Sequence, residues 1–350
     1  MTISFVEFIG HLTSNIQFFI TVVLVLATIF VNGWHDASNA IATVVATRSM
    51  GAKAAIVMAA LFNFLGVFIM TSFSSSVAQT IYKMVDFGGD SHSALLALCA
   101  ALFAIVVWSV VTWYYGLPSS ASHALIAGLT GGAIAIHGGL DAVNGSEWIK
   151  VVYGLVISAV LGFGGGYGIS KIVGWTFKAF DRRKTLQFFH NGQIAAGALL
   201  AFMHGAHDGQ KFMSVFLLGC FLAEGNANVT SFEIPIWLMI LCSLVMALGT
   251  SIGGYRIIKS VGMNMVHLET WEGFSACVSA SALLFYATVT GIPMSTTQSK
   301  TTCIMGVGAA KRLSNVNWPV AGNMVLTWVL TFPGCGLIGY LMVKLAMLFI

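Results

Sequence analysis

Two His-Asp pairs interrupt long apolar stretches of this chain, and each is followed, after nearly the same interval, by a Pro-led run of hydroxyl side chains. His35-Asp36 precedes the run Gly-Leu-Pro-Ser-Ser-Ala-Ser-His at 116–123, and His207-Asp208 precedes Gly-Ile-Pro-Met-Ser-Thr-Thr-Gln at 291–298. Carboxylates bind hard cations or protons. Hydroxyls and free backbone N–H groups at a helix N-terminus bind oxyanions. The repeated patterns therefore predict one site that takes a cation and an anion together.

The acidic part of this site is predicted at Asp36 and Asp208, the two acidic residues that fall in the middle of apolar segments. A carboxylate in hydrocarbon costs at least about 2.5–3.5 kcal/mol even on the lenient insertion scale. Two at matching positions therefore indicate cation binding, as ligands of Na⁺ if sodium is the coupling ion, rather than a structural pair that holds helices together. Asn39 and its counterpart Lys211 complete the set of residues predicted to bind the cation and couple it to the anion. Lys211 either contacts the anion or simply neutralises Asp208.

The anion-binding part is predicted where Pro118 and Pro293 can each stand in the first turn of a helix, because a missing N–H is no loss there. Hydroxyl side chains then crowd that turn, although the same residues also cap helices and mediate helix packing. The two histidines beside the aspartates either donate to the anion, relay a proton or orient the carboxylate. The predicted anion ligands are Ser119, Ser120, Ser122, Ser295, Thr296, Thr297, His35, His207, His123 and Gln298.

The composition indicates what kind of protein must position these groups. Hydrophobic residues make up 57% of the chain and charged residues 8%, with a mean hydropathy of +0.89. So few charges cannot cover a water-soluble globule, which predicts an all-α polytopic membrane protein surrounded by lipid. The net charge of +4 comes from basic residues gathered in short loops, so nucleic-acid binding is not expected.

Ten apolar runs are long enough to cross a bilayer, which needs about 20 residues. They predict a first membrane repeat at 1–180, a basic cytoplasmic linker at 181–190 and a second repeat at 191–350. Most of the sixteen basic residues fall in loops on one side if the N-terminus is outside, so both termini are predicted to be extracytoplasmic and the repeats inverted. Gly33, Gly205 and Gly209 predict broken helices at the His-Asp pairs, and the Pro-led runs predict re-entrant segments at the centre.

The motifs resemble those of the inorganic phosphate transporter family over almost the whole chain. The residues that carry the resemblance are Gly-Trp-His-Asp-Ala-Ser-Asn-Ala at 33–40, Gly-Ala-His-Asp-Gly-Gln-Lys at 205–211 and the two Pro-led runs. The resemblance implies a compact prokaryotic symporter that imports phosphate with Na⁺ or H⁺, in some members as a metal–phosphate complex that would involve Mg²⁺. It also implies that Asp36 and Asp208 bind cations, while the hydroxyl side chains and Asn39 surround phosphate and ions.

This chain departs from the family pattern at several of these positions. Histidine replaces the usual asparagine before each aspartate, Lys211 takes an asparagine-like position and Gln298 replaces a common histidine. The two histidines place a protonatable pair near the site, which favours H⁺ as the coupling ion.

Other functions remain as alternatives. A sulfate or other oxyanion permease of the same fold would use the same hydroxyl groups, and a passive channel would need no coupling. An intramembrane metal-dependent hydrolase would use the His-Asp pairs as metal ligands. No Walker motif is present in the sequence, so we expect a transporter and not an enzyme, without a cofactor, driven by an ion gradient or by a partner protein. Assembly of the chain into a homo-oligomer is compatible with the sequence.

Overall fold

The protein is a bundle of long helices. The computed structural model describes residues 2–87, 91–226, 229, 231–253 and 258–349, apart from the side chains at 37–39, 182, 260 and 349. In this part of the chain the only β pairing is two isolated bridges, Val85 with Val143 and Val266 with Val316. The predicted all-α fold is therefore confirmed.

The helices follow one another in a pattern that occurs twice. In each half, two helices separated by a Pro-led run are followed by a 3₁₀ turn and then by a long helix. The first half contains α1 (Phe5–Ser14), α2 (Ile16–Ala46), α3 (Ala52–Phe73), α4 (Ser76–Tyr82), α5 (Ser91–Tyr114), α6 (Ala121–His137), η1 (Leu140–Ala142) and α7 (Gly145–Thr176). The second contains α8 (Arg182–Ala223), α9 (Ile236–Ile252), η2 (Ser260–Asn264), α11 (Thr270–Thr290), α12 (Thr296–Lys311), η3 (Leu313–Asn315), α13 (Trp318–Ala346) and η4 (Met347–Phe349).

Six of these helices are long and apolar enough to cross a membrane: α2, α3, α5, α7, α11 and α13. The other predicted segments correspond to α6, α9 and α12, which are shorter, and to α8, which carries the second His-Asp pair. A multi-pass membrane protein is thus confirmed, whereas a total of ten crossings stays a prediction. Most of the predicted linker at 181–190 is helical, because α8 begins at Arg182, capped by the Asp181 side chain. The division into repeats also stays a prediction.

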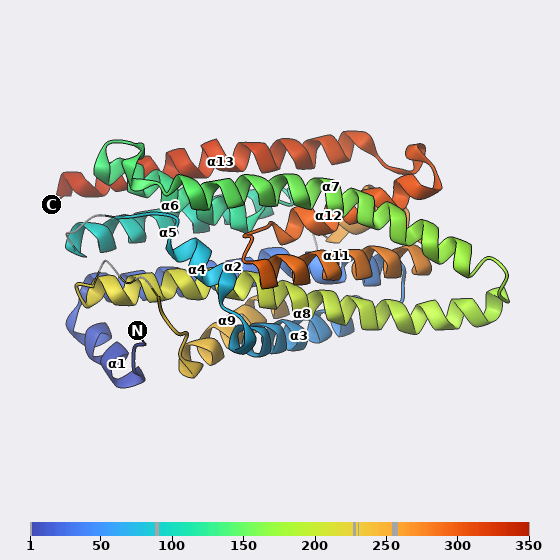
Figure 1. Cartoon of the computed structure of the whole chain (residues 1–350), viewed down its shortest axis with the longest axis horizontal. Coiled ribbons are helices and arrows are strands. Elements are labelled where there is room, and N and C mark those ends of the chain that lie inside the picture. The colour runs from blue at the N-terminus through green and yellow to red at the C-terminus, as the bar shows by residue number, and fades with distance from the viewer. Residues whose placement is uncertain (1, 88–90, 227–228, 230, 254–257, 350) are drawn as a thin grey trace.

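The helices on either side of each Pro-led run form a helical hairpin whose tip lies inside the molecule. α6 and α12 begin near the middle of the long axis and run toward opposite ends (Figure 1). Gly116 and Gly291, with φ values of 67° and 72°, reverse the chain in the left-handed conformation that glycine tolerates best. The side chains of Ser120 and Ser295 then cap α6 and α12 by accepting from the backbone N–H of His123 and Gln298.

The prediction of helix breaks at the His-Asp pairs is wrong, because α2 and α8 run without interruption through Asp36 and Asp208. The glycines there serve close packing instead. A Cβ at Gly33 would collide with the backbone carbonyl of Met246 on α9, and one at Gly205 with that of Asn63 on α3. Small residues let membrane helices approach in this way. In the described part of the chain, the unwound segments at the centre are the Pro-led runs, where proline and a left-handed glycine both end helices.

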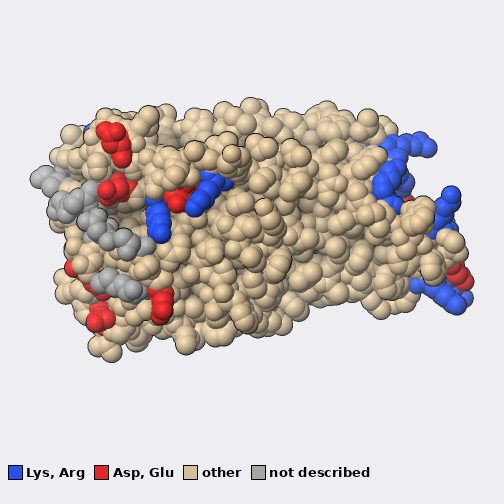
Figure 2. Space-filling view, viewed as in Figure 1, with Lys and Arg blue, Asp and Glu red and all other residues tan. Residues whose placement is uncertain are grey.

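Charged side chains gather at the two ends of the molecule, and a band without them lies between (Figure 2). α7 ends, α8 begins and α12 ends at one extremity, which we call the basic end (Figure 1). Its basic residues include Lys178, Arg183, Lys184, Lys311 and Arg312. The opposite extremity carries both chain termini (Figure 1). An uncharged band between polar ends is what a bilayer requires.

The glycines of α7 provide a test of this packing. Gly166 faces α12, where an added Cβ would collide with the backbone carbonyl of Cys303, whereas a Cβ at Gly164 would meet no atom within 4 Å beyond its own helical backbone. Overpacking costs roughly 1–3 kcal/mol. We therefore expect Gly166→Ala to lower the thermal unfolding temperature in detergent and Gly164→Ala to leave it unchanged or raise it. Equal unfolding temperatures for the two variants would contradict the close contact of α7 with α12.

Candidate functional site

The two predicted acids meet at the centre of the bundle, on α2 and α8. Each is 1% exposed. Asp36 accepts a hydrogen bond from Thr297 of the second hairpin, with 3.2 Å between Oγ1 and Oδ1. Asp208 accepts one from Thr296 of the same hairpin, with 3.0 Å between Oγ1 and Oδ2. The first turn of α12 therefore contacts an acid from each half of the chain.

Lys211 joins Asp208 to the first hairpin. Its Nζ lies 2.7 Å from Asp208 Oδ1 and donates to Ser122 Oγ at 2.6 Å and to the Met294 carbonyl at 2.6 Å. Ser122 is in the first turn of α6, and Met294 is in the unwound segment before α12. The N-termini of both hairpin helices, which are the positive ends of the helix dipoles, thus meet at the acid pair.

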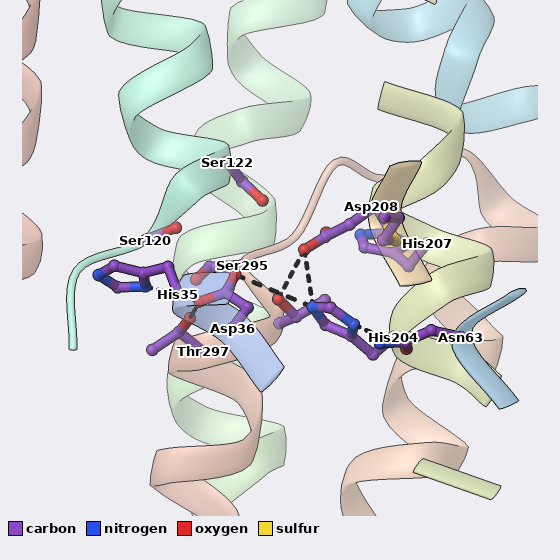
Figure 3. Close-up of polar contacts among 12 residues, drawn as sticks. His35, Asp36, Asn63, Ser120, Ser122, His204, His207, Asp208, Ser295 and Thr297 are labelled. Carbon is purple, nitrogen blue, oxygen red and sulfur yellow. Dashed lines mark hydrogen bonds and ion pairs between the residues drawn. The ribbon is translucent and has the colours of Figure 1, made fainter. Parts of the chain in front are cut away.

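His204 lies between the two acids, where the sequence motifs alone did not place a functional residue. Its Nε2 is 3.4 Å from Asp208 Oδ2 and 3.9 Å from Asp36 Oδ2, and its Nδ1 is 3.0 Å from Asn63 Oδ1 (Figure 3). Asn63, on α3, in turn donates to Thr250 on α9 at 3.0 Å. These contacts fix the ring plane, so one imidazole edge faces both carboxylates.

Asp36, His204 and Asp208 can offer one ligand atom each, all within 4.8 Å of one another. Two carboxylate oxygens and an imidazole nitrogen can share a proton or bind a small cation. The sequence signal that would have found His204 is its spacing of one helical turn before Asp208, which places both side chains on the same face of α8. The sequence signal that would have found Asn63 is the presence of a single amide side chain in an otherwise apolar stretch.

The remaining predicted ligands divide into two groups. His35 lies close to the acids: its Nδ1 is 3.0 Å from Asp36 Oδ1 and its Nε2 is 3.3 Å from Ser119 Oγ. His207 instead supports the second hairpin, since its ring nitrogens lie 3.0 Å from Thr288 Oγ1 and 3.0 Å from the Met294 carbonyl. Both nitrogens of His207 are therefore already engaged by protein atoms.

His123 and Gln298, which occupy matching positions in the two runs, face outward from the hairpins. The His123 ring stacks on Phe332 of α13, with 4.7 Å between centroids. Gln298 donates to the Leu155 carbonyl of α7 at 3.2 Å. Neither is brought to the acid pair, and the hydroxyls of Ser120 and Ser295 serve as helix caps. The side chain of Asn39 lies outside the described residues.

A buried acid pair held between two helical hairpins, inside a multi-pass helical bundle, defines a membrane transporter. Residues 32–339 match the model of the phosphate transporter family, and the chain belongs to this family. The predicted family is thereby confirmed, as is the expectation of a transporter rather than an enzyme.

Individual relatives agree with this assignment. The chain is 39% identical over 312 residues to a probable low-affinity inorganic phosphate transporter of Bacillus subtilis (strain 168), covering 89% of this chain and 92% of that protein. A relative of the same description from Rhizobium meliloti (strain 1021) is 37% identical over 313 residues, with 89% and 91% covered. The fold matches a solved structure described as the sodium-dependent phosphate transporter, with a TM-score of 0.88, 22% identity, and coverage of 95% of this chain and all of that one.

The hydrogen bond from Thr297 to Asp36 crosses between the halves of the chain and can be tested alone. Thr297→Val removes the hydroxyl and keeps the shape. Because a hydrogen bond to a charged group contributes about 1.5–3 kcal/mol, we expect phosphate uptake into proteoliposomes to fall by about tenfold or more. Thr301→Val is the matched control, since the Thr301 hydroxyl donates only to the Thr297 carbonyl on its own helix. A similar loss in both variants would show that the effect lies in α12 and not in the acid contact.

Proposed function

We propose that this protein imports inorganic phosphate across the cytoplasmic membrane together with a coupling cation, by alternating access. The observation that carries the proposal is the meeting of two buried acids with the N-termini of α6 and α12 at one place. The helix N-termini and hydroxyls suit a phosphate oxyanion, and the acids suit the cation. The names of the relatives support phosphate over sulfate as the substrate.

Charge balance supports coupling to a cation. Asp36 and Asp208 carry two negative charges, and Lys211 compensates one of them. A phosphate anion entering beside the remaining charge would be repelled strongly in a site of low dielectric constant. A cation at Asp36, His204 and Asp208 removes this repulsion, so anion and cation bind together. Binding of the anion then depends on binding of the cation, which is what a symporter requires.

The coupling cation is H⁺ or Na⁺, and the same three side chains can take either. The protonatable residues around the acids favour H⁺, whereas the solved structure with the matching fold is described as sodium-dependent. Transport of phosphate as a complex with Mg²⁺ is a further variant of the same proposal. A passive channel would show neither saturation nor loss of uptake on adding an ionophore.

The distribution of charge supports an orientation with the basic end in the cytoplasm. Both termini then face away from the cytoplasm, as predicted, and the hairpins of the two halves enter the membrane from opposite sides (Figures 1 and 2). Rocking of the halves about the central site would expose it to each side in turn.

Replacement of the acids tests the proposal. We expect Asp36→Asn and Asp208→Asn to abolish concentrative phosphate uptake, because an amide cannot exchange a proton or compensate a cation. Uptake is measured in proteoliposomes under imposed H⁺ or Na⁺ gradients, with and without Mg²⁺, and in competition with sulfate. Glu233→Gln, an exposed acid in a loop, is the control. Full uptake by either aspartate variant, or no response of wild-type uptake to any gradient, would contradict the mechanism.

A further inference from the structure

Lys211 is surrounded by oxygen atoms as a bound metal cation would be. Its ammonium group is 0% exposed and contacts a carboxylate oxygen of Asp208, the hydroxyl of Ser122 and the backbone carbonyl of Met294, at 2.7, 2.6 and 2.6 Å. An ammonium group has three protons, so these three contacts use all of them. The Met294 carbonyl is free to accept because it belongs to the unwound segment before α12.

The same three groups form a typical ligand set for an alkali cation. Na⁺ sites in transporters combine carboxylates and hydroxyls with backbone carbonyls from unwound helix segments. We propose that the Lys211 ammonium is a permanent substitute for one coupling cation, attached to the chain and carried through every cycle. The inference rests on the proposed symport and specifies its stoichiometry, since the chain then requires one ion fewer from solution.

The comparison of the two halves supports this assignment. Lys211 stands three residues after Asp208, where Asn39 stands three residues after Asp36. The acid in the second half therefore has a covalently tethered cation. His35 and His204 contact Asp36, and neither is permanently charged. Because the tethered cation is bonded to Asp208, we assign the exchangeable cation to the Asp36 side of the acid pair.

A purely structural ion pair gives a different expectation for removal of the lysine. If Lys211 only stabilises the fold, its replacement leaves Asp208 uncompensated, and no ion restores transport. If it substitutes for a cation, a smaller neutral residue leaves room for Na⁺ among the same oxygen atoms. Asparagine is the appropriate replacement because position 39 of the first half carries it.

We expect Lys211→Asn to require one more Na⁺ per phosphate than the wild type. The measurement is the ratio of ²²Na⁺ to ³²P taken up by proteoliposomes, together with the effect of NaCl, against choline chloride, on thermal unfolding in detergent. Na⁺ should raise phosphate uptake by the variant by about tenfold or more and should stabilise it more than it stabilises the wild type. Lys211→Met fills the space with hydrocarbon and should stay inactive in either salt. Lys311→Asn, at an exposed lysine, should match the wild type.

An unchanged Na⁺-to-phosphate ratio in an active Lys211→Asn variant would overturn the inference. So would a folded variant that no salt reactivates. If Lys211→Asn does not fold, Lys211→Gln is measured in the same way and judged by the same ratio. Absence of phosphate uptake by the wild type would instead reject the proposed function, while the Na⁺-specific thermal stabilisation of the variant would still test the cation site.

A separate observation concerns Lys300, a second buried lysine that this mechanism does not use. It lies on α12, about one turn beyond Thr296 and Thr297, and is 1% exposed. Among the described residues its Nζ has no hydrogen-bond partner. Leu125 occupies the corresponding position in the first half, so the fold does not require a charge there. A buried ammonium without a counter-charge is costly and indicates a missing anion.

Polar side chains from two other helices contact Cys277 of α11, which lies near this lysine. The Cys277 sulfur lies 3.0 Å from Thr43 Oγ1 of α2 and 3.9 Å from Gln193 Nε2 of α8. Gln193 is fully buried, and its Oε1 has no partner among the described residues. α12 runs from the central site toward the basic end (Figure 1), so this group lies on the path to that end.

We infer that Lys300, with Gln193 and Thr43, forms a second binding site for a tetrahedral oxyanion on the cytoplasmic side of the acid pair. Phosphate leaving the central site would bind there to the Lys300 ammonium, which has no hydrogen-bond partner among the described residues. The site would be used during release, so it affects the maximal rate of uptake and not the affinity for external phosphate. This inference also rests on the proposed phosphate import.

Lys300→Met should lower the maximal rate of phosphate uptake severalfold at unchanged KM for external phosphate. Lys300→Arg, which keeps the charge, should retain more of the rate, and Lys311→Met should behave as the wild type. Removal of an unpaired buried charge should not lower the unfolding temperature, which is measured alongside. A wild-type rate in Lys300→Met, or a raised KM at an unchanged rate, would overturn the second site. If the methionine variant does not fold, Lys300→Leu is tested, because Leu125 holds the equivalent position.

Discussion

Two carboxylates in the middle of an apolar bundle impose the constraint on which the rest of the structure depends. Neither Asp36 nor Asp208 reaches water, so each must be compensated by protein groups or by an ion. Lys211 compensates Asp208, while hydroxyls from α12 and imidazoles from α2 and α8 partner the acids on their other sides. The hairpins must therefore bring their tips to the centre, because only there can their hydroxyls and helix N-termini reach the acids.

This requirement explains why the helices that carry the acids are unbroken and the hairpins are not. A continuous α2 or α8 satisfies its own backbone hydrogen bonds in lipid and fixes the acid at a defined depth. The unwound segments are tolerated because they are buried in protein at the site, where the Met294 carbonyl accepts from Lys211 and His207. The unwound segments thus supply backbone carbonyl oxygens to the site, and the continuous helices α2 and α8 supply its charged side chains.

The contacts also make the two halves chemically unequal. The second half contains both buried lysines, at positions where the first half has Asn39 and Leu125. In the proposed mechanism, a tethered cation on one side and an exchangeable one on the other let the site bind an anion and a single ion in a defined arrangement. A permanent ammonium neither leaves nor exchanges, so it adds affinity for the anion without adding dependence on a gradient.

Much of this protein is determined by the sequence alone. Composition and the length of apolar runs predict the helical membrane protein, because lipid leaves the backbone few ways to satisfy its polar groups. The cost of burying Asp36 and Asp208 predicts that they are functional, and proline with glycine marks the hairpin tips. Only the tertiary structure decided the rest: that His204 faces both acids, that Lys211 reaches Ser122 and Met294, and that His123 and Gln298 point outward. These facts depend on how helices distant in sequence rotate and pack against one another, and local pattern does not encode that rotation.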